Sequence, residues 1–248
     1  MLNYGLELTG TERDEAVWDL VAEGAALDEV VAGEADWDQL TPAAGWTVAH
    51  QIAHLAAADR NTLLAVKSPE RFSEVIGRSA DLDAEAGAAL PRDTLLEQWR
   101  AGRDELAGVL KDLPADYAFP WYGSDLTAPM MAPMRVMETW AHGQDIYDTL
   151  GVEHPPSDAL RHVAALGVAG RALGFVAGGL PVPTEAVRVE LTGPGAGTWG
   201  PEDAEQRVEG SALDFALRVT LRRSRSETDL KAVGEDAEQW LDVARVFL

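Results

Sequence analysis

The chain has 248 residues, with 20 Lys+Arg against 42 Asp+Glu, a formal net charge of −22 and no cysteine. A surface this acidic repels phosphate backbones and anionic lipid headgroups, so we expect neither a nucleic-acid nor a membrane partner, and a small molecule or a metal cation is favoured. The lack of cysteine excludes disulfide frameworks, cysteine nucleophiles and thiolate metal sites, which leaves imidazole and carboxylate groups as metal ligands.

The chain shows neither a secretory signal nor an apolar membrane segment. The opening residues MLNYGLELTGTERDE have no basic region and soon become acidic. The apolar stretch over 162–182 carries Arg171 at its centre and several glycines, which argues against lipid-facing residues. We therefore expect a cytoplasmic location, which also suits the absence of cysteine.

The first 150 residues are expected to be all helical, because apolar residues recur at three- and four-residue steps and no convincing alternating run appears. Thr11 is expected to cap the first helix, Pro133 to lie in the first turn of the last, and Gly151 to follow the end of the last. The pattern predicts a four-helix bundle over residues 1–152, with helices at 11–32, 46–66, 92–110 and 133–150.

A proline-rich connection, GVEHPPSD, follows the bundle and has the composition of a domain boundary. Beyond it, helical and strand patterns are mixed, so residues 158–248 are expected to form a small α+β domain. The fold class is therefore α plus α+β. The expected strands lie in AVRVELTG, TWG, QRVEG and TDLKAV, and the expected helices span 158–178, 212–221 and 236–247.

Two histidines lie on one face of the second predicted helix. His50 and His54 are four residues apart, and Asn61 falls on the same stripe. The alanines beside His54, at 53, 57 and 58, leave space that a metal or ligand would need. This spacing favours a binding face but does not decide between a ligand and a packed core histidine.

The last bundle helix carries a narrow polar notch formed by Glu138, His142 and Asp145, which occupy about 60° of its circumference between apolar flanks. A buried carboxylate and imidazole are costly unless they pair or bind a cation. His54, Glu138 and His142 then provide the ligand number of a catalytic zinc site. The alternative is a surface pair, and Asp145 could accept the second N–H of His54 or His142 or face solvent.

GWTVAHQIAHL, followed about 85 residues later by METWAHGQDIYDTLG, resembles the metal-binding signature of the DinB-like superfamily, in the branch of mycothiol-dependent maleylpyruvate isomerase. Trp46, His54, Glu138, His142 and Asp145 stand at the positions of that signature. The C-terminal region resembles the small α/β domain, similar to sterol carrier protein 2, that accompanies the bundle. The segments that carry this likeness are VRVELTGPGAGTWG, RVEGSALDFALRVTLRR and WLDVARVF.

The resemblance implies a divalent metal, with zinc favoured, held by His54, Glu138 and His142, and mycothiol as thiol cosubstrate. It also implies that Arg222, or the neighbouring Arg223, holds an anionic substrate, although both could instead be surface residues at a helix end. His50 departs from the usual pattern and could be a fourth ligand, a proton shuttle or a bystander.

Three functions remain open from the sequence. The first is an isomerase or S-transferase that activates a thiol or water on a metal for attack on a small electrophile. The second is a thiol-independent metal-dependent isomerase, cyclase or hydrolase, and the third is a non-catalytic binding protein for a small molecule. Trp121 and Tyr122, in the long loop before the last bundle helix, could close over the bundle mouth. No oligomeric state can be read from the sequence.

Overall fold

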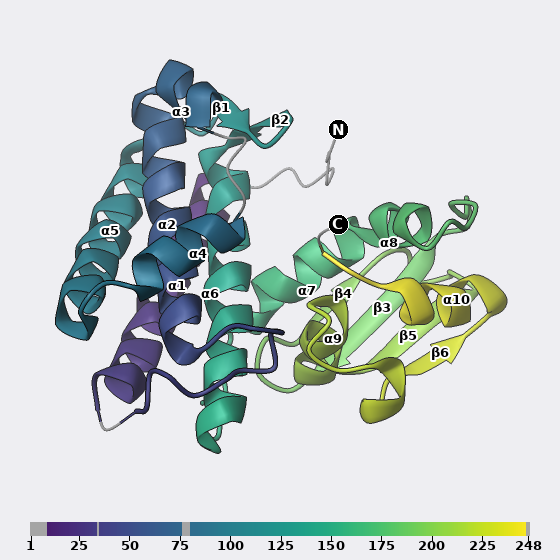
Figure 1. Ribbon diagram of the computed structural model, residues 1–248. Coiled ribbons are helices and arrows are strands. Elements are labelled where there is room, and N and C mark those ends of the chain that lie inside the picture. Colours follow the sequence, from purple (N-terminus) through teal and green to yellow (C-terminus); the bar gives the residue numbers. More distant parts are fainter. Residues whose placement is uncertain (1–8, 34, 76–79, 247–248) are drawn as a thin grey trace. The chain divides into compact units, whose positions relative to one another are not determined.

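The structure is a computed structural model that describes residues 9–33, 35–75 and 80–246. Over these residues the chain divides into two compact units, and the boundary in the sequence lies between Pro155 and Pro156. The first unit is helical apart from one small hairpin, and the second combines a sheet with helices (Figure 1). This confirms the fold class predicted from the sequence.

Four long helices form the bundle of the first unit (Figure 1). The first packs against the third and fourth, and so does the second. Amphipathic patterning explains why each forms: in the third, the apolar residues at three- and four-residue steps are the buried ones, with Trp99 only 1% exposed. The helices are α1 (Gly10–Ala32), α2 (Val48–Lys67), α5 (Arg92–Asp112) and α6 (Ala128–Leu150).

Short elements that the sequence pattern did not reveal fill the connections. Helices α3 (Pro69–Val75) and α4 (Ala80–Ala88) lie between α2 and α5. Strands β1 (Ala118–Trp121) and β2 (Ser124–Thr127) form an antiparallel hairpin before α6. The expectation of an all-helical first unit is therefore wrong at this point, because four-residue strands are too short to show an alternating pattern.

Two expected helix starts also need correction. Thr9, not Thr11, caps α1: its Oγ1 accepts from the Glu12 N–H at 3.3 Å, and the Glu12 carboxylate accepts from the Thr9 N–H at 2.8 Å. Helix α6 begins five residues before Pro133, so this proline lies inside the helix, and Pro129 takes the first-turn position. The expected end is confirmed, since Gly151 adopts φ 64° just after α6.

The second unit contains a four-stranded sheet in the order β4-β3-β5-β6. The central strands β3 and β5 are parallel, and the two outer strands run antiparallel to their neighbours. The Val187, Val189 and Leu191 side chains alternate with more exposed ones, as predicted. The strands are β3 (Val187–Thr192), β4 (Gly197–Trp199), β5 (Gln206–Ser211) and β6 (Lys231–Val233).

The helices of this unit are shorter than expected. The single helix predicted over 158–178 is broken at Gly170, where a Cβ would lie 3.1 Å from the Leu166 carbonyl oxygen and 3.2 Å from the Arg245 carbonyl oxygen. The closing helix stops at Val243, and its predicted end at Phe247 lies outside the described residues. The helices are α7 (Leu160–Ala169), α8 (Arg171–Ala177), α9 (Ala212–Val219), the 3-10 turn η1 (Arg225–Glu227) and α10 (Glu235–Val243).

Within the described ranges, no single helix has the length and apolar character needed to cross a membrane, and only the bent pair of α7 and α8 meets those criteria, by length and composition alone.

Candidate metal centre

Helices α2 and α6 bring three potential metal ligands together in the bundle. The Oε2 atom of Glu138 lies 3.3 Å from Nε2 of His54 and 3.3 Å from Nε2 of His142. The three ligand atoms all lie within 4.8 Å of one another, and each side chain is partly buried. The residues that the sequence singled out as a ligand set are therefore neighbours in space.

The spacing of these atoms suits a tetrahedrally coordinated metal ion. Two ligand atoms bonded to zinc at about 2.1 Å lie about 3.4 Å apart at the tetrahedral angle. The two nitrogen–oxygen separations around Glu138 match this value. One carboxylate oxygen and two imidazole nitrogens also form the donor set of catalytic zinc sites that leave a coordination position open for water or substrate.

The electrostatics of Glu138 favour its charged form. Burial raises the pKa of this carboxyl, but the hydrogen bonds from His142 and His54, together with their charges, outweigh burial and hold the pKa well below its usual range. A carboxylate that stays ionised in a partly buried position is a strong ligand for a cation.

Gln51, which the sequence analysis overlooked, sets the proton position on His142. Its side chain is buried in α2, and its amide nitrogen donates to Thr41 Oγ1 at 2.8 Å and approaches Asp145 Oδ2 at 3.4 Å. Its amide oxygen therefore faces Nδ1 of His142 at 2.6 Å, and that nitrogen donates. In neutral His142 the lone pair then lies on Nε2, pointing at the Glu138 carboxylate.

This arrangement fits a cation between the two side chains. A lone pair on Nε2 and an ionised carboxylate oxygen 3.3 Å away repel each other unless a proton or a metal ion lies between them. A metal ligand histidine commonly donates its other N–H to an oxygen acceptor, as His142 does here. The residues present therefore fit a divalent metal.

Trp46 forms an aromatic wall beside the cluster. Its ring centroid lies 5.2 Å from that of His54 and 5.9 Å from that of His142, with the second pair stacked at 23°. Its indole Nε1–H donates to Asp81 Oδ1 at 3.2 Å, which ties it to α4. An indole in this position limits the access of water to the imidazoles.

His50 and Asp145 lie near the cluster but outside the ligand group. The ring of His50 contacts Thr47 Oγ1 through Nδ1 at 2.8 Å and Glu85 Oε2 through Nε2 at 3.1 Å. Asp145 is buried and adjoins the amide nitrogen of Gln51. Their suggested roles, as proton shuttle and as orienting carboxylate, stay predictions.

Arg222 belongs to the second unit, just beyond α9, where its Nη1–H donates to the Thr220 carbonyl oxygen at 2.8 Å. The neighbouring Arg223 donates to the Arg222 carbonyl oxygen at 2.9 Å. A role for either residue in holding an anionic substrate also stays a prediction.

The aromatic pair expected to form a lid is part of the β1–β2 turn. Trp121 stacks on the buried Phe72 of α3, with ring centroids 5.5 Å apart and planes at 3°. Tyr122 meets the same ring edge-on at 5.7 Å and has φ 31°, next to Gly123 with φ 92°. The hairpin is thus held against α3 by aromatic packing.

Comparisons with known proteins agree with these features. The sequence model of the mycothiol maleylpyruvate isomerase N-terminal domain matches residues 17–147. Two uncharacterized proteins of Mycobacterium tuberculosis, from strains CDC 1551 / Oshkosh and ATCC 25618 / H37Rv, are each 45% identical over 243 residues, covering 93% of this chain and 94% of their own.

Two crystal structures share the fold. One is a mutant of mycothiol-dependent maleylpyruvate isomerase, with a TM-score of 0.61 and 17% identity, and the other is the same enzyme without that mutation, with a TM-score of 0.57 and 18% identity. Each match covers 94% of this chain and 95% of the other.

The bundle, the appended α/β unit and the clustered His54, Glu138 and His142 define a DinB-like protein with a candidate metal centre. Since the family's sequence model matches more than half of it, the chain belongs to the mycothiol maleylpyruvate isomerase family.

Proposed function

We propose that this protein is a metal-dependent enzyme of the mycothiol-dependent isomerase and S-transferase type, acting on a small electrophilic substrate. The convergence of two imidazole nitrogens and one carboxylate oxygen from α2 and α6 carries this proposal. His54, Glu138 and His142 would hold the divalent metal, with zinc favoured by the donor set.

When bound, such a metal supplies Lewis acidity that favours the ionised form of a thiol or water. The protein's own groups prepare the site for that chemistry. Gln51 keeps the proton of His142 on Nδ1 and leaves Nε2 directed inward. Trp46 covers the imidazoles and reduces competing hydration.

Further residues would handle protons and substrate charge. His50 links Thr47 to Glu85 through its two ring nitrogens and could move a proton between the site and the surface, where Glu85 is exposed. Asp145 would help to fix the orientation of Gln51. Arg222 would bind the anionic end of the substrate by a bidentate contact.

The family membership supports mycothiol as the thiol cosubstrate. A low-molecular-weight thiol is abundant in a reducing compartment, and a chain without cysteine suits the cytoplasm. The substrate would be a small electrophile that accepts a thiolate reversibly for isomerisation or permanently for S-transfer.

The test is a two-substrate assay on the purified, metal-loaded full chain. Mycothiol is offered with maleylpyruvate and with a panel of electrophiles, and free thiol and substrate absorbance are followed together. We expect thiol-dependent turnover that Glu138→Gln abolishes, while the matched substitution of an exposed α5 carboxylate, Glu97→Gln, leaves it unchanged.

Two outcomes would contradict the proposal. Turnover that is independent of every thiol would identify a thiol-independent metal enzyme. Equal activity of Glu138→Gln and wild type would remove the metal centre from the reaction.

A further inference from the structure

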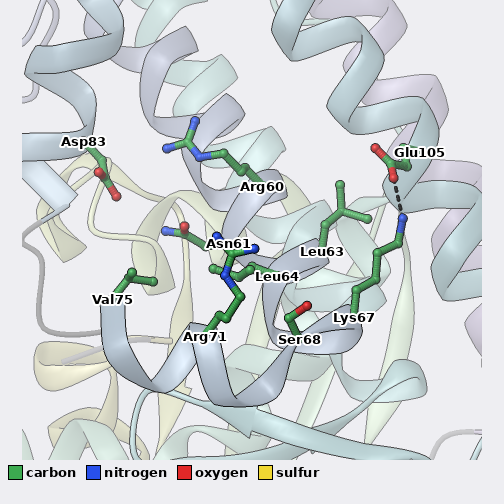
Figure 2. Close-up of a pocket in the computed structure, with 10 residues that line it drawn as sticks. All are labelled: Arg60, Asn61, Leu63, Leu64, Lys67, Ser68, Arg71, Val75, Asp83 and Glu105. Carbon is green, nitrogen blue, oxygen red and sulfur yellow. Dashed lines mark hydrogen bonds and ion pairs between the residues drawn. The ribbon is translucent and has the colours of Figure 1, made fainter.

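An open pocket of about 490 Å³ lies along the second half of α2, and residues of α3, α4 and α5 complete its lining (Figure 2). Leu63, Leu64 and Val75 form the apolar part of its lining, and the polar part comes from Arg60, Asn61, Lys67, Ser68, Arg71, Asp83 and Glu105. None of these residues belongs to the candidate metal centre.

Two of the three cations in this pocket form no ion pair with any residue that the structure describes. Over the residues that the structure describes, neither Arg60 nor Arg71 forms an ion pair or a hydrogen bond. Lys67, in contrast, is paired with Glu105 and points away from the two arginines (Figure 2). In a chain with 42 acidic and 20 basic residues, two arginines that line one pocket without an ion-pair partner among the described residues are unexpected.

The donors that line the pocket come from two elements. Arg60 and Asn61 come from α2 and Arg71 from α3, and in Figure 2 the Arg71 side chain extends toward Asn61. The Asn61 amide nitrogen donates one hydrogen to the Tyr122 hydroxyl, with the nitrogen and oxygen 3.5 Å apart, and its second hydrogen can serve a ligand. Each guanidinium presents a planar fork that matches two oxygens of an oxyanion.

We propose that this pocket binds the phosphate group of a small hydroxylated molecule, between Arg60, Arg71 and Asn61. Two guanidinium forks and an amide provide more donors than the two oxygens of a carboxylate can use, whereas a phosphate has enough acceptors for all of them. Asp83, on the α4 side, accepts hydrogen bonds only, so it suits ligand hydroxyl groups and repels a second anionic group.

The site is separate from the candidate metal centre. Asn61, at the near end of the pocket, follows His54 by seven residues, which corresponds to about 10 Å along an α-helix. Phosphate binding therefore depends neither on a bound metal nor on the proposed isomerase chemistry, and the two proposals can fail independently.

The probe is inorganic phosphate, titrated calorimetrically into the metal-free full chain at constant ionic strength. Arg60→Gln and Arg71→Gln remove one fork each, and Lys231→Gln removes an exposed cation from β6 as the control. We expect the wild type to bind phosphate with a dissociation constant below about 10 mM. Each arginine variant should lose about tenfold in affinity, and the double variant should not bind. The control should bind as the wild type does.

Further titrations with other ligands distinguish the class of ligand, and the arginine variants show where it binds. Glycerol phosphate should bind at least as tightly as phosphate, and malonate more weakly. No phosphate binding by the wild type, equal binding by the arginine variants, binding only after zinc is added, or tighter binding of malonate would each overturn the proposal. Unchanged thermal unfolding of the variants, expected because both arginines are exposed, excludes misfolding as the cause.

Discussion

The amide oxygen of Gln51 accepts a hydrogen bond from Nδ1 of His142 across 2.6 Å, which joins α2 to α6 directly behind the candidate metal centre. Gln51 has no exposed surface, and its amide nitrogen is engaged by Thr41 and lies near Asp145. The glutamine cannot rotate without losing these contacts. It therefore fixes both the tautomer and the ring orientation of His142.

Gln51→Leu should weaken zinc binding by about 10- to 100-fold, because Nδ1 of His142 loses its acceptor while all three ligands remain. Competition with a chromophoric chelator measures the affinity. Gln51→Glu keeps an acceptor and should retain zinc. Gln39→Leu serves as a control, since exposed Gln39 donates to the Thr149 carbonyl oxygen away from the ligands. Wild-type affinity in Gln51→Leu would show that Gln51 does not position His142.

Asp59 and Arg135 form an ion pair inside the bundle, with the Arg135 Nη2 to Asp59 Oδ1 distance 3.0 Å and both side chains almost fully buried. Burial raises the pKa of the Asp59 carboxyl, although the charge and hydrogen bond of Arg135 act to lower it. Removal of this cation takes away the largest of the interactions that stabilise the ionised carboxylate in its buried position. Arg135→Met should therefore lower the free energy of unfolding by about 3–5 kcal/mol at neutral pH.

The sign of the pH dependence follows from the raised pKa. Ionisation of Asp59 costs more free energy in the folded than in the unfolded state. This cost to stability therefore develops as pH rises above the pKa of Asp59 in the unfolded chain, and it disappears below that pKa. The loss in Arg135→Met should thus shrink toward acidic pH. Urea unfolding at several pH values tests this, and the double variant Asp59→Leu, Arg135→Met should recover most of the stability. A pH-independent loss would contradict the account.

Glu138 behaves in the opposite way, since its folded pKa lies below the usual value of 4.5. Its ionised form stabilises the metal-free protein above that value, and the contribution is lost as pH falls through the folded pKa. Wild-type protein freed of metal should lose stability relative to Glu138→Gln as pH is lowered from 4.5. Thermal unfolding of both proteins across this range makes the comparison, and parallel curves would refute a depressed pKa.

His154 anchors the end of the first unit. Its ring stacks on Tyr147, with centroids 4.2 Å apart, and its nitrogens contact the Gln144 amide oxygen at 3.0 Å and the Glu23 carboxylate at 3.3 Å. His154→Ala should cost about 3 kcal/mol, because it removes the stacking and leaves Glu23 buried without its partner. Calorimetric unfolding measures this, and a cost near zero would mean that the contacts contribute nothing to stability.

The sequence predicted the long bundle helices because their apolar residues repeat with the helical period. The start of α5 is Arg92, as expected, and its end differs by only two residues. The short elements of the connections were missed for a physical reason: α3, α4 and each strand of the hairpin have between four and nine residues, too few to establish a period.

The three ligand residues were predicted from the sequence, whereas Gln51 beside them was not. Glu138 and His142 are four residues apart on α6, so their proximity follows from helix geometry. The contact between Gln51 and His142 depends on how α2 and α6 are aligned, which local spacing does not encode. Arg60 and Arg71 line one pocket because α2 ends at Ser68 and α3 follows it directly, and no sequence signal indicated a pocket there.

The central claim, that His54, Glu138 and His142 hold a divalent metal, is tested most directly by elemental analysis of untagged protein after incubation with zinc. Wild type, His54→Ala and His50→Ala are compared, the last because His50 lies beside the cluster without belonging to it. The account predicts one ion per chain in the wild type and in His50→Ala, and loss of the ion in His54→Ala. Equal metal content in wild type and His54→Ala, or no metal in any of the three, would contradict it.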